Sequence, residues 1–314
     1  MKKIFLLFLA ATAVIAFQSC DKSDSDDSQE GSETTNWWYR TGVVSGGIKS
    51  ISDGYTTENF DDKGRLTSTV SPYSNTQYEY NSTGLISRIA ELDPSDVDKV
   101  LEERIFEYGN PGKFIPNLMG PGRMFHINET GLIPGLSKIK YKYATGNNNC
   151  EVDFKFEGDN LLAILSFPGT PNRDTTIVKY QGDYPYEYSN GWEFIGPITY
   201  YSNGMFKEYR EGFSSGEQIT SDRRYYYLES NKFMLLAKST ETSYGTTSTT
   251  EYTYDDKGNT VRSVYSNGEN KSITEFSYEF DSNGNWTKCT VTSKDGEGQE
   301  IGPGMVQTRV IEYW

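Results

Sequence analysis

From Trp37 to the C-terminus, apolar and polar residues alternate with a period of two in short runs. Tyr, Phe, Thr, Val and Ile recur in these runs, and Asn-Gly, Asp-Gly or Lys-Gly breaks separate them. Such alternation is typical of strands with one buried face, and the glycine-containing breaks are typical of turns between antiparallel strands. The pattern therefore predicts an all-β fold, an antiparallel meander of hairpins that forms one twisted sheet or a partial barrel.

Several of these hairpins share one template, in which two aromatic residues at i and i+2 precede a polar turn that contains glycine. The clearest copies are Tyr252-Thr-Tyr254-Asp-Asp-Lys-Gly258 and Tyr278-Glu-Phe280-Asp-Ser-Asn-Gly284, with looser copies from Asn59 and Tyr78 and degenerate ones from Phe154 and Tyr225. In a hairpin, Asp or Asn starts the turn and Gly accepts the positive φ. The template resembles the YD repeat of Rhs-type proteins and of surface lipoproteins of the Bacteroides phylum. That resemblance implies an architecture and says almost nothing about function.

Two segments interrupt the alternation. Asp93-Pro94-Ser95 precedes apolar residues at Val97, Val100 and Leu101, a spacing that predicts one short helix ending near Glu103. Residues 109–135 are rich in Pro and Gly among apolar residues, and we expect an ordered insertion that packs against the sheet. Irregular segments on a rigid scaffold are common places for binding sites.

The N-terminus has the features of a secretory signal. Lys2 and Lys3 precede an apolar stretch, residues 4–17, that is too short to cross a bilayer comfortably. The sequence Phe17-Gln18-Ser19-Cys20 resembles a bacterial lipobox. The resemblance implies that residues 1–19 are a lipoprotein signal peptide and that Cys20 carries the lipid, palmitate among its acyl chains.

Residues 20–35 are expected to form a disordered acidic tether. Between Asp21 and Thr35 there are six acids and no apolar residue, so this segment cannot bury enough surface to fold. Its acid cluster resembles the export signal of surface lipoproteins in the Bacteroides phylum, which implies the outer face of the outer membrane; an ordinary solvated linker is the alternative. No second polar linker follows, so residues 36–314 are predicted to form a single β domain.

The formal net charge of −14 limits the partners. A chain this acidic repels phosphate backbones and anionic head groups, which argues against nucleic acid and against membrane binding through basic residues. We expect contact with the membrane through lipid on Cys20 instead.

Cysteine and histidine usage restricts the chemistry further. If Cys20 is lipidated, Cys150 and Cys289 are left for a disulfide in an oxidising compartment; two separately buried thiols are the alternative. The chain has one histidine, His126, and a multi-His zinc site needs more than one. A partly buried, hydrogen-bonded histidine is favoured over a catalytic one.

Two short motifs fit turns better than active sites. Gly212-Phe-Ser214-Ser-Gly216 has the form of a nucleophile elbow, but no histidine follows it and its context is β. Asp281-Ser-Asn283-Gly-Asn285 offers the first ligands of a calcium loop, but Trp286 and Thr292 occupy the positions that require Gly and Glu. We therefore expect no catalytic residue, no metal and no cofactor.

Aromatic residues are the remaining signal. Exposed Trp and Tyr can bind the apolar faces of sugar rings, and the candidates for this role are Trp37, Trp38, Tyr39, Tyr186, Tyr188 and Trp192. The alternative is that Tyr is simply a good strand former. Separately, Asp174-Thr175-Thr176 resembles the acceptor motif for O-glycosylation in the Bacteroides phylum, which implies Thr175 as the acceptor.

Together these features predict a lipid-anchored outer-membrane or cell-surface binding protein whose ligand is a polysaccharide or an envelope protein. A carboxylate-based glycan hydrolase is one alternative, because acids are plentiful although no pair stands out. A purely structural envelope component is the other.

Overall fold

The computed structural model describes residues 47–116, 132–146, 149–168, 173–189, 193–202, 206–215, 218–229, 235–268 and 270–314. These residues form β-strands and no helix. The first half of the chain contributes β1 (Ile48–Ser52), β2 (Thr57–Phe60), β3 (Leu66–Val70), β4 (Asn75–Tyr80), β5 (Ile86–Asp93), β6 (Asp96–Tyr108), β7 (Phe114–Pro116), β8 (Leu132–Pro134), β9 (Leu136–Tyr143), β10 (Cys150–Glu157), β11 (Asn160–Ser166) and β12 (Arg173–Gln181). The second half contributes β13 (Tyr184–Ser189), β14 (Glu193–Ile195), β15 (Thr199–Tyr200), β16 (Phe206–Ser215), β17 (Gln218–Leu228), β18 (Leu235–Ser243), β19 (Thr246–Tyr254), β20 (Thr260–Asn267), β21 (Asn270–Phe280), β22 (Trp286–Asp295), β23 (Met305–Thr308) and β24 (Val310–Tyr313).

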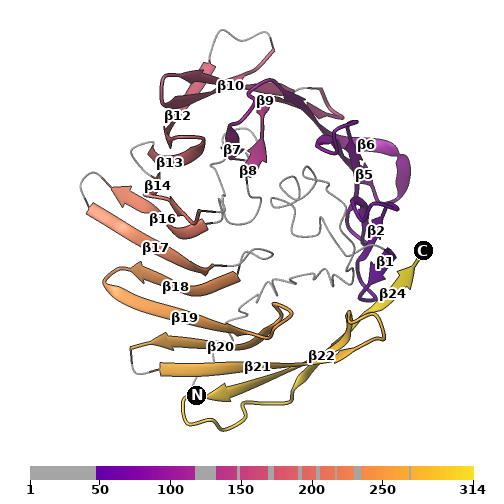
Figure 1. Ribbon diagram of the computed structural model, residues 1–314, viewed down its shortest axis with the longest axis vertical. Helices are drawn as coiled ribbons and strands as arrows, with labels where there is room; N and C mark the ends of the chain where they lie inside the picture. The colour runs from indigo at the N-terminus through magenta and orange to yellow at the C-terminus, as the bar shows by residue number, and fades with distance from the viewer. Residues whose placement is uncertain are drawn as a thin grey trace, which may run out of the picture.

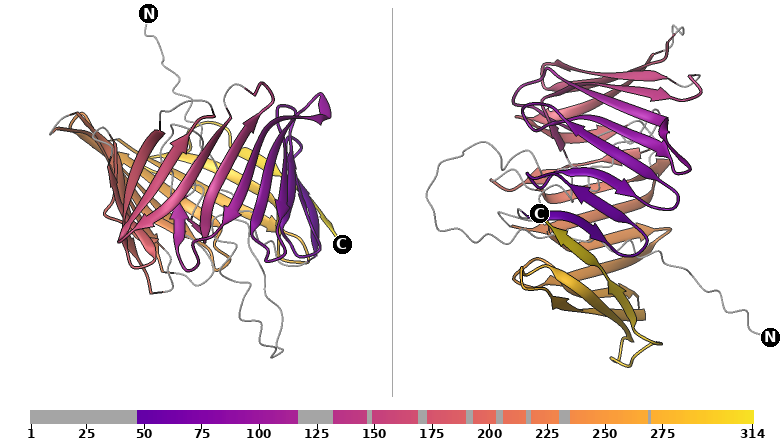
Figure 2. Two further views of the ribbon diagram at one scale, coloured as in Figure 1. Left: turned by 90° about the horizontal axis from the view of Figure 1, so that it is seen from above. Right: turned by 90° about the vertical axis from the view of Figure 1, so that its right-hand side faces the viewer.

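Twenty-two of these strands form one antiparallel sheet that curves into a ring (Figure 1). Neighbours in the sheet are mostly neighbours in sequence; β6 pairs with β9 because β7 and β8 form a separate hairpin, and both β14 and β15 pair with β16. At the ends, β23 pairs with β22 and β24 pairs with β1. The strands are tilted and strongly twisted in the side views (Figure 2). The predicted all-β antiparallel meander is confirmed.

Five hairpin turns share one hydrogen-bond pattern. At Asp255, the backbone N–H donates to the carbonyl of Asn259 (2.9 Å) and the carbonyl accepts from the N–H of Gly258 (3.1 Å). Oδ1 of Asp255 accepts from the N–H groups of Lys257 and Asn259 (3.0 and 2.7 Å). The same contacts recur in the turns that begin at Asp61, Asn81, Asp281 and Asp295.

The fourth residue of each of these turns is a glycine with positive φ, 80° at Gly258, a conformation that a side chain disfavours. The expected hairpin template is thus confirmed at four sites, and the turn at Asp295 is an additional copy. Sequence reasoning missed the copy at Asp295 because no pair of aromatic residues precedes it.

Tyrosine hydroxyls connect one hairpin to the next. In each case a tyrosine near the end of a strand donates to a carbonyl two residues after the glycine of the preceding turn. The hydrogen bonds are Tyr80 to Leu66 (2.8 Å), Tyr108 to Ile86 (2.5 Å) and Tyr278 to Thr260 (2.8 Å). Burial raises the pKa of all three hydroxyls, so they stay protonated donors. The aromatic positions of the template therefore hold successive hairpins in register.

The β7–β8 hairpin lies inside the ring and covers its main core (Figure 1). Ile115 of β7 and Ile133 of β8 are fully buried in the cluster that includes the inward residues of β9 to β12. Burying one such side chain stabilises the fold by about 1.5–3 kcal/mol. The described ends of the predicted insertion, residues 109–135, thus pack against the sheet; its middle lies outside the described residues.

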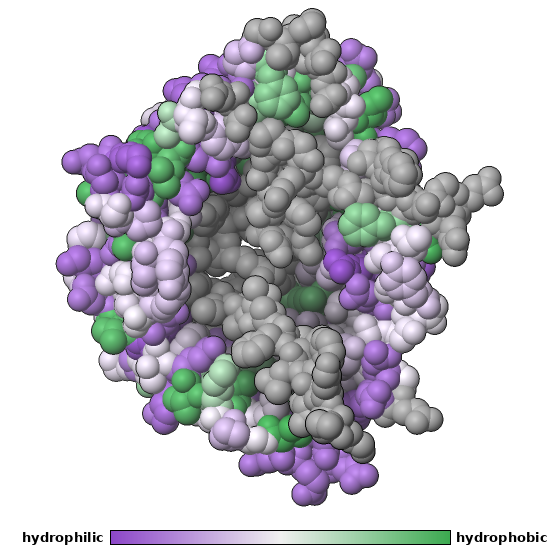
Figure 3. Space-filling model, turned by 180° about the vertical axis from the view of Figure 1, so that it is seen from behind, coloured by the Kyte–Doolittle hydropathy of each residue, from purple (hydrophilic) through white to green (hydrophobic). Residues whose placement is uncertain are grey.

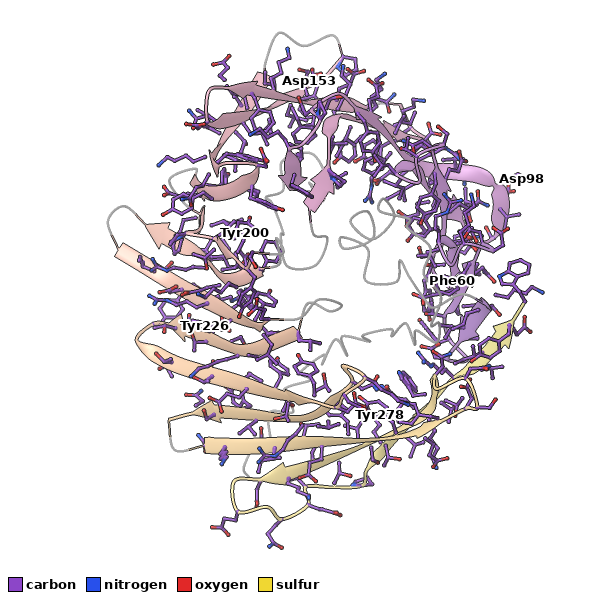
Figure 4. All side chains as sticks on the ribbon, in the orientation of Figure 1. Phe60, Asp98, Asp153, Tyr200, Tyr226 and Tyr278 are labelled. Carbon is purple, nitrogen blue, oxygen red and sulfur yellow. The ribbon has the colours of Figure 1, made fainter. Side chains whose placement is uncertain are left out.

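The C-terminal strand closes the ring through a second, smaller core. Ile48, Ile51, Phe60 and Leu66 form this cluster, and Ile311 of β24 packs on it. In the register of β24 and β1, Ile311 lies directly opposite Ile51. Figure 4 shows Phe60 on the inner side of the ring. The C-terminal strand thus joins the last part of the sheet to the first.

The helix predicted after Asp93 is wrong. Asp93 and Asp96 are paired at the tip of the β5–β6 hairpin, and Oδ1 of Asp93 accepts from the N–H of Ser95 (3.0 Å). Val97, taken as part of an apolar helix face, is 59% exposed. Asp-Pro-Ser fits a turn as well as a helix start, and the long partner strand β5 decides in favour of the turn.

A matched pair of substitutions tests the turn network. Asp255→Ala removes three acceptor contacts, including one from Nδ2 of Asn259 (2.8 Å), a residue that is 4% exposed. We expect the free energy of unfolding to fall by about 1–3 kcal/mol, the cost of leaving buried polar groups unpaired. Asp256→Ala, which changes the exposed neighbour, should leave it within about 0.5 kcal/mol. Equal urea midpoints for the two variants would contradict this role.

Candidate binding face inside the ring

The two faces of the ring differ in chemistry. On the outer face, ion pairs run across strands: Arg88 contacts Glu79 (2.6 Å) and Glu103 (2.5 Å), and Lys142 contacts Glu103 (2.9 Å). The space-filling view shows hydrophilic residues over much of the periphery, with hydrophobic residues in separate small groups (Figure 3). Ion pairs at a protein surface contribute about 0–1 kcal/mol each, so these pairs keep the outer face polar more than they stabilise it.

The inner face carries a row of touching aromatic rings. Tyr184 stacks on Phe114 with ring centroids 4.7 Å apart and 6° between the planes, and it also contacts Tyr200 at 4.7 Å. Tyr200 contacts Phe206 at 5.4 Å, and Phe206 contacts Tyr227 at 6.0 Å. Figure 4 shows Tyr200 on the inner side of the ring. These rings come from β7, β13, β15, β16 and β17, so segments far apart in sequence form one surface.

Exposure changes along this row. Phe206 and Tyr227 are buried, whereas Phe114, Tyr184 and Tyr200 are only partly buried. The hydroxyl of Tyr200 donates to the carbonyl of Pro185 (2.7 Å), which fixes the ring. Partly exposed, immobilised rings of this kind can stack on the apolar faces of a ligand.

From β18 to β22 the inner face changes from apolar to neutral polar. Directly paired residues in an antiparallel sheet point to the same face, so the register identifies the rows. One row of paired residues starts at Tyr225 and continues through Ser239, Thr250, Tyr265 and Ser272. A second row starts at Tyr252 and continues through Ser263, Thr274 and Ser293. None of these side chains is charged, and all are able to donate and accept hydrogen bonds.

A half-buried carboxylate marks the border between the apolar and polar parts. Glu211 on β16 accepts hydrogen bonds from the hydroxyls of Tyr209 and Tyr225, the latter at 2.9 Å. Burial first, and the negative charge of Glu211 second, raise the pKa of both tyrosines. Because two protonated donors occupy its oxygens, Glu211 is a structural acceptor in this arrangement.

The seam where the ring closes holds a second polar cluster. Arg309, between β23 and β24, is 7% exposed; its Nε donates to the carbonyl of Trp286, and its guanidinium lies 3.8 Å from the centroid of that ring. Burial lowers the pKa of Arg309 to about 10, so it remains charged at neutral pH. Nearby, the hydroxyl of Tyr313 donates to Asp281.

Glu58 on β2 is a carboxyl whose pKa lies well above its ordinary value. Burial raises the pKa of Glu58 to about 7, although the positive charge of Arg309 acts in the opposite direction. Within the described ranges, its buried Oε2 has no hydrogen-bond partner. Glu58 is thus a carboxyl group that exchanges a proton near neutral pH.

The residues predicted to bind a ligand are only partly brought together. Tyr186 is half-buried on β13, whereas Tyr188 is buried in the main core and has a structural role. Cys20, Trp37, Trp38, Tyr39, His126 and Trp192 lie outside the described residues. The aromatic contacts of Phe114 and Tyr200 and the position of Tyr265 were not predicted, because they depend on which strands become neighbours.

The remaining predicted residues lie in strands. Thr175 is exposed on β12, and its glycosylation stays a prediction. Ser214 lies at the end of β16 and is followed by β17, so a strand follows it where a nucleophile elbow needs a helix. No cluster of three or more metal-ligating side chains occurs among the described residues. No helix in this part of the chain is long and apolar enough to span a membrane.

The suggested Cys150–Cys289 disulfide is not formed. Both thiols are free and buried, on β10 and β22. Strand β10 pairs with β9 and β11, and β22 pairs with β21 and β23, so the two cysteines are not on neighbouring strands. A disulfide needs Cα atoms within about 7 Å. The alternative of two separately buried thiols describes the structure.

Comparison with known proteins gives fold-level likenesses only. No family model matches the chain, and no curated protein matches it. A porin-like protein from Bacteroides uniformis aligns over 84% of this chain and 98% of its own, with a TM-score of 0.35 and 10% identity. TcdB2-TccC3-TEV aligns over 78% of this chain and 14% of its own (TM-score 0.24, 13% identity). The Tc holotoxin pore of Photorhabdus luminescens aligns over 82% of this chain and 16% of its own (TM-score 0.19, 11% identity). TM-scores this low carry no functional argument.

The ionisation of Glu58 predicts a pH dependence of stability. The pKa of this carboxyl is higher in the folded state, about 7 against 4.5, so the stability associated with its proton is complete below 4.5 and is lost as the pH rises to about 7. Relative to Glu58→Gln, the free energy of unfolding of the wild type should fall by up to about 3 kcal/mol over this interval. Urea unfolding from pH 4 to pH 8 measures the difference. Glu297→Gln, in an exposed turn, serves as the control, and a constant difference between wild type and Glu58→Gln would contradict the assignment.

Proposed function

We propose that this protein is a lipid-anchored binding protein of the outer membrane, held there through Cys20, and that the inner face of its ring binds polysaccharide. The observation that carries the proposal is the joint presence of partly exposed aromatic rings and uncharged hydroxyl side chains on that one face. Sugars present an apolar ring face and a rim of hydroxyl groups, and such a surface offers partners for both.

The lipobox and the acidic tether support the location. A chain with this net charge has little attraction for anionic head groups, so an acyl anchor is the means of attachment that its chemistry favours. A tether of about 15 residues lets a binding surface move relative to the membrane while it stays attached.

One observation favours glycan hydrolysis as a second function. Glu58, with its pKa near 7, has the property required of a general acid at neutral pH. Asp53 is close enough for its negative charge to raise the pKa of Glu58, so it is the candidate for the second carboxyl of a hydrolase. Shortening of a bound polysaccharide by the wild type, and not by Glu58→Gln, would favour a hydrolase over a binding protein.

Binding is tested with the full-length protein in detergent micelles on a broad panel of immobilised glycans. We expect saturable binding to at least one extended polysaccharide. In a pull-down from envelope extracts, the same protein should bring down glycan rather than a single protein. No binding across the panel would contradict the proposal, and a lone protein partner would favour a structural role.

The anchor is tested by Cys20→Ser. This variant keeps the signal segment but lacks the sulfur that forms the thioether with the lipid. In detergent phase partitioning we expect the wild type in the detergent phase and the variant in the aqueous phase, because removing the acyl chains removes about 0.8 kcal/mol per buried methylene. The urea midpoints of the two proteins should agree, since the tether separates the anchor from the sheet. Equal partitioning would contradict lipidation at Cys20.

A further inference from the structure

We propose that Tyr265 on β20 is the centre of a subsite for an uncharged sugar unit, and that the ligand of this protein is a neutral polysaccharide rather than an anionic one. This inference rests on the proposed function and adds the place and the chemical class of the ligand.

Tyr265 combines a free aromatic surface with hydroxyl groups on both sides. Its side chain is 39% exposed. Thr250 of β19 and Ser272 of β21 lie directly opposite it in the two flanking pairs. Side chains at such positions have Cβ atoms about 5 Å apart, so both hydroxyls reach the edge of a ring that stacks on the tyrosine.

The surroundings of Tyr265 are uncharged over several strands. In the row on one side, Ser248 pairs with Asn267, and Asn267 pairs with Asn270. In the row on the other side, Ser263 pairs with both Tyr252 and Thr274. Diagonal neighbours lie about 7–8 Å away, which is roughly the span of one sugar unit. Amide and hydroxyl groups of this kind can follow the hydroxyl groups of a sugar without a charge.

Charge selects against anionic glycans. Among the described residues of β19 to β22, the register places Lys and Arg on the outer face, where Lys294 pairs with Glu275 (2.6 Å) and Lys288 with Glu279 (2.6 Å). One inner row reaches Glu241 on β18, whose charge is balanced by Arg223 on β17 (2.9 Å), and another ends at the acid Asp295 on β22. The whole chain carries a formal net charge of −14, so its overall field is negative. Carboxylates accept hydrogen bonds from sugar hydroxyls and repel uronic acids.

The test compares neutral and anionic probes on the full-length protein in micelles. The probes are hexasaccharides of glucose, mannose and xylose, and a hexasaccharide of galacturonic acid, each titrated by calorimetry. We expect measurable binding of at least one neutral probe and at least tenfold weaker binding of the galacturonic acid probe at low salt. Tyr265→Ala should weaken binding of the neutral probe about tenfold, which corresponds to about 1.4 kcal/mol, because it removes the ring on which the sugar stacks.

Three further variants make the result specific. Tyr265→Phe keeps the ring and should stay within about threefold of wild type, and Tyr265→Thr, which suits a strand, should lose as much affinity as Tyr265→Ala. Tyr73→Ala removes a ring that is 78% exposed in the turn after β3 and should bind as wild type. Unchanged binding in Tyr265→Ala, or a preference for galacturonic acid, would overturn this inference and leave the proposed function in place. Absence of binding to every glycan would overturn both.

Discussion

Pairing of β24 with β1 is the constraint on which the rest of the structure depends. A sheet of 22 strands with two open edges would leave rows of unpaired N–H and C=O groups that invite association with other chains. The two ends of the sheet are joined instead: β24 pairs with β1, where Ile311 lies opposite Ile51, and β23 pairs with β22. Closure also creates an inside and an outside, so every period-two pattern along the chain acquires a definite direction.

The inside is then divided by composition. Strands such as β10 and β11 carry Val, Leu and Phe on their inner face, which would expose a large apolar area if nothing covered it. The β7–β8 hairpin covers this area with Ile115 and Ile133. Where β18 to β22 carry Ser, Thr and Tyr inward, no cover is needed for solubility. One curved sheet thus provides a rigid packed half and a half whose inner side chains remain able to bind.

The sequence predicted the local features well and the distant ones poorly. An Asp or Asn followed three residues later by Gly determines a turn through contacts within five residues, which is why the hairpins at Asp61, Asn81, Asp255 and Asp281 were predictable. The helix after Asp93 failed because local apolar spacing was outweighed by pairing with β5. The burial of Tyr188, the separation of Cys150 from Cys289 and the position of Tyr265 between Thr250 and Ser272 all depend on strand order. No local pattern contains that order.

The polar cluster at the seam follows from the way the ring closes. The segment formed by β23 and β24 changes its pairing partner at Arg309: β23 pairs with β22, and β24 pairs with β1. The ladder of backbone hydrogen bonds is interrupted at this point. The N–H of Arg309 still donates to Thr287 (2.9 Å), but the carbonyl of Trp286 needs a donor, which the guanidinium supplies. A buried cation favours acidic groups nearby, and Asp281 and Glu58 are the acids whose charges it senses. Two effects oppose each other at Glu58: burial raises its pKa, and the charge of Arg309, held at the seam by the change of neighbours, lowers it.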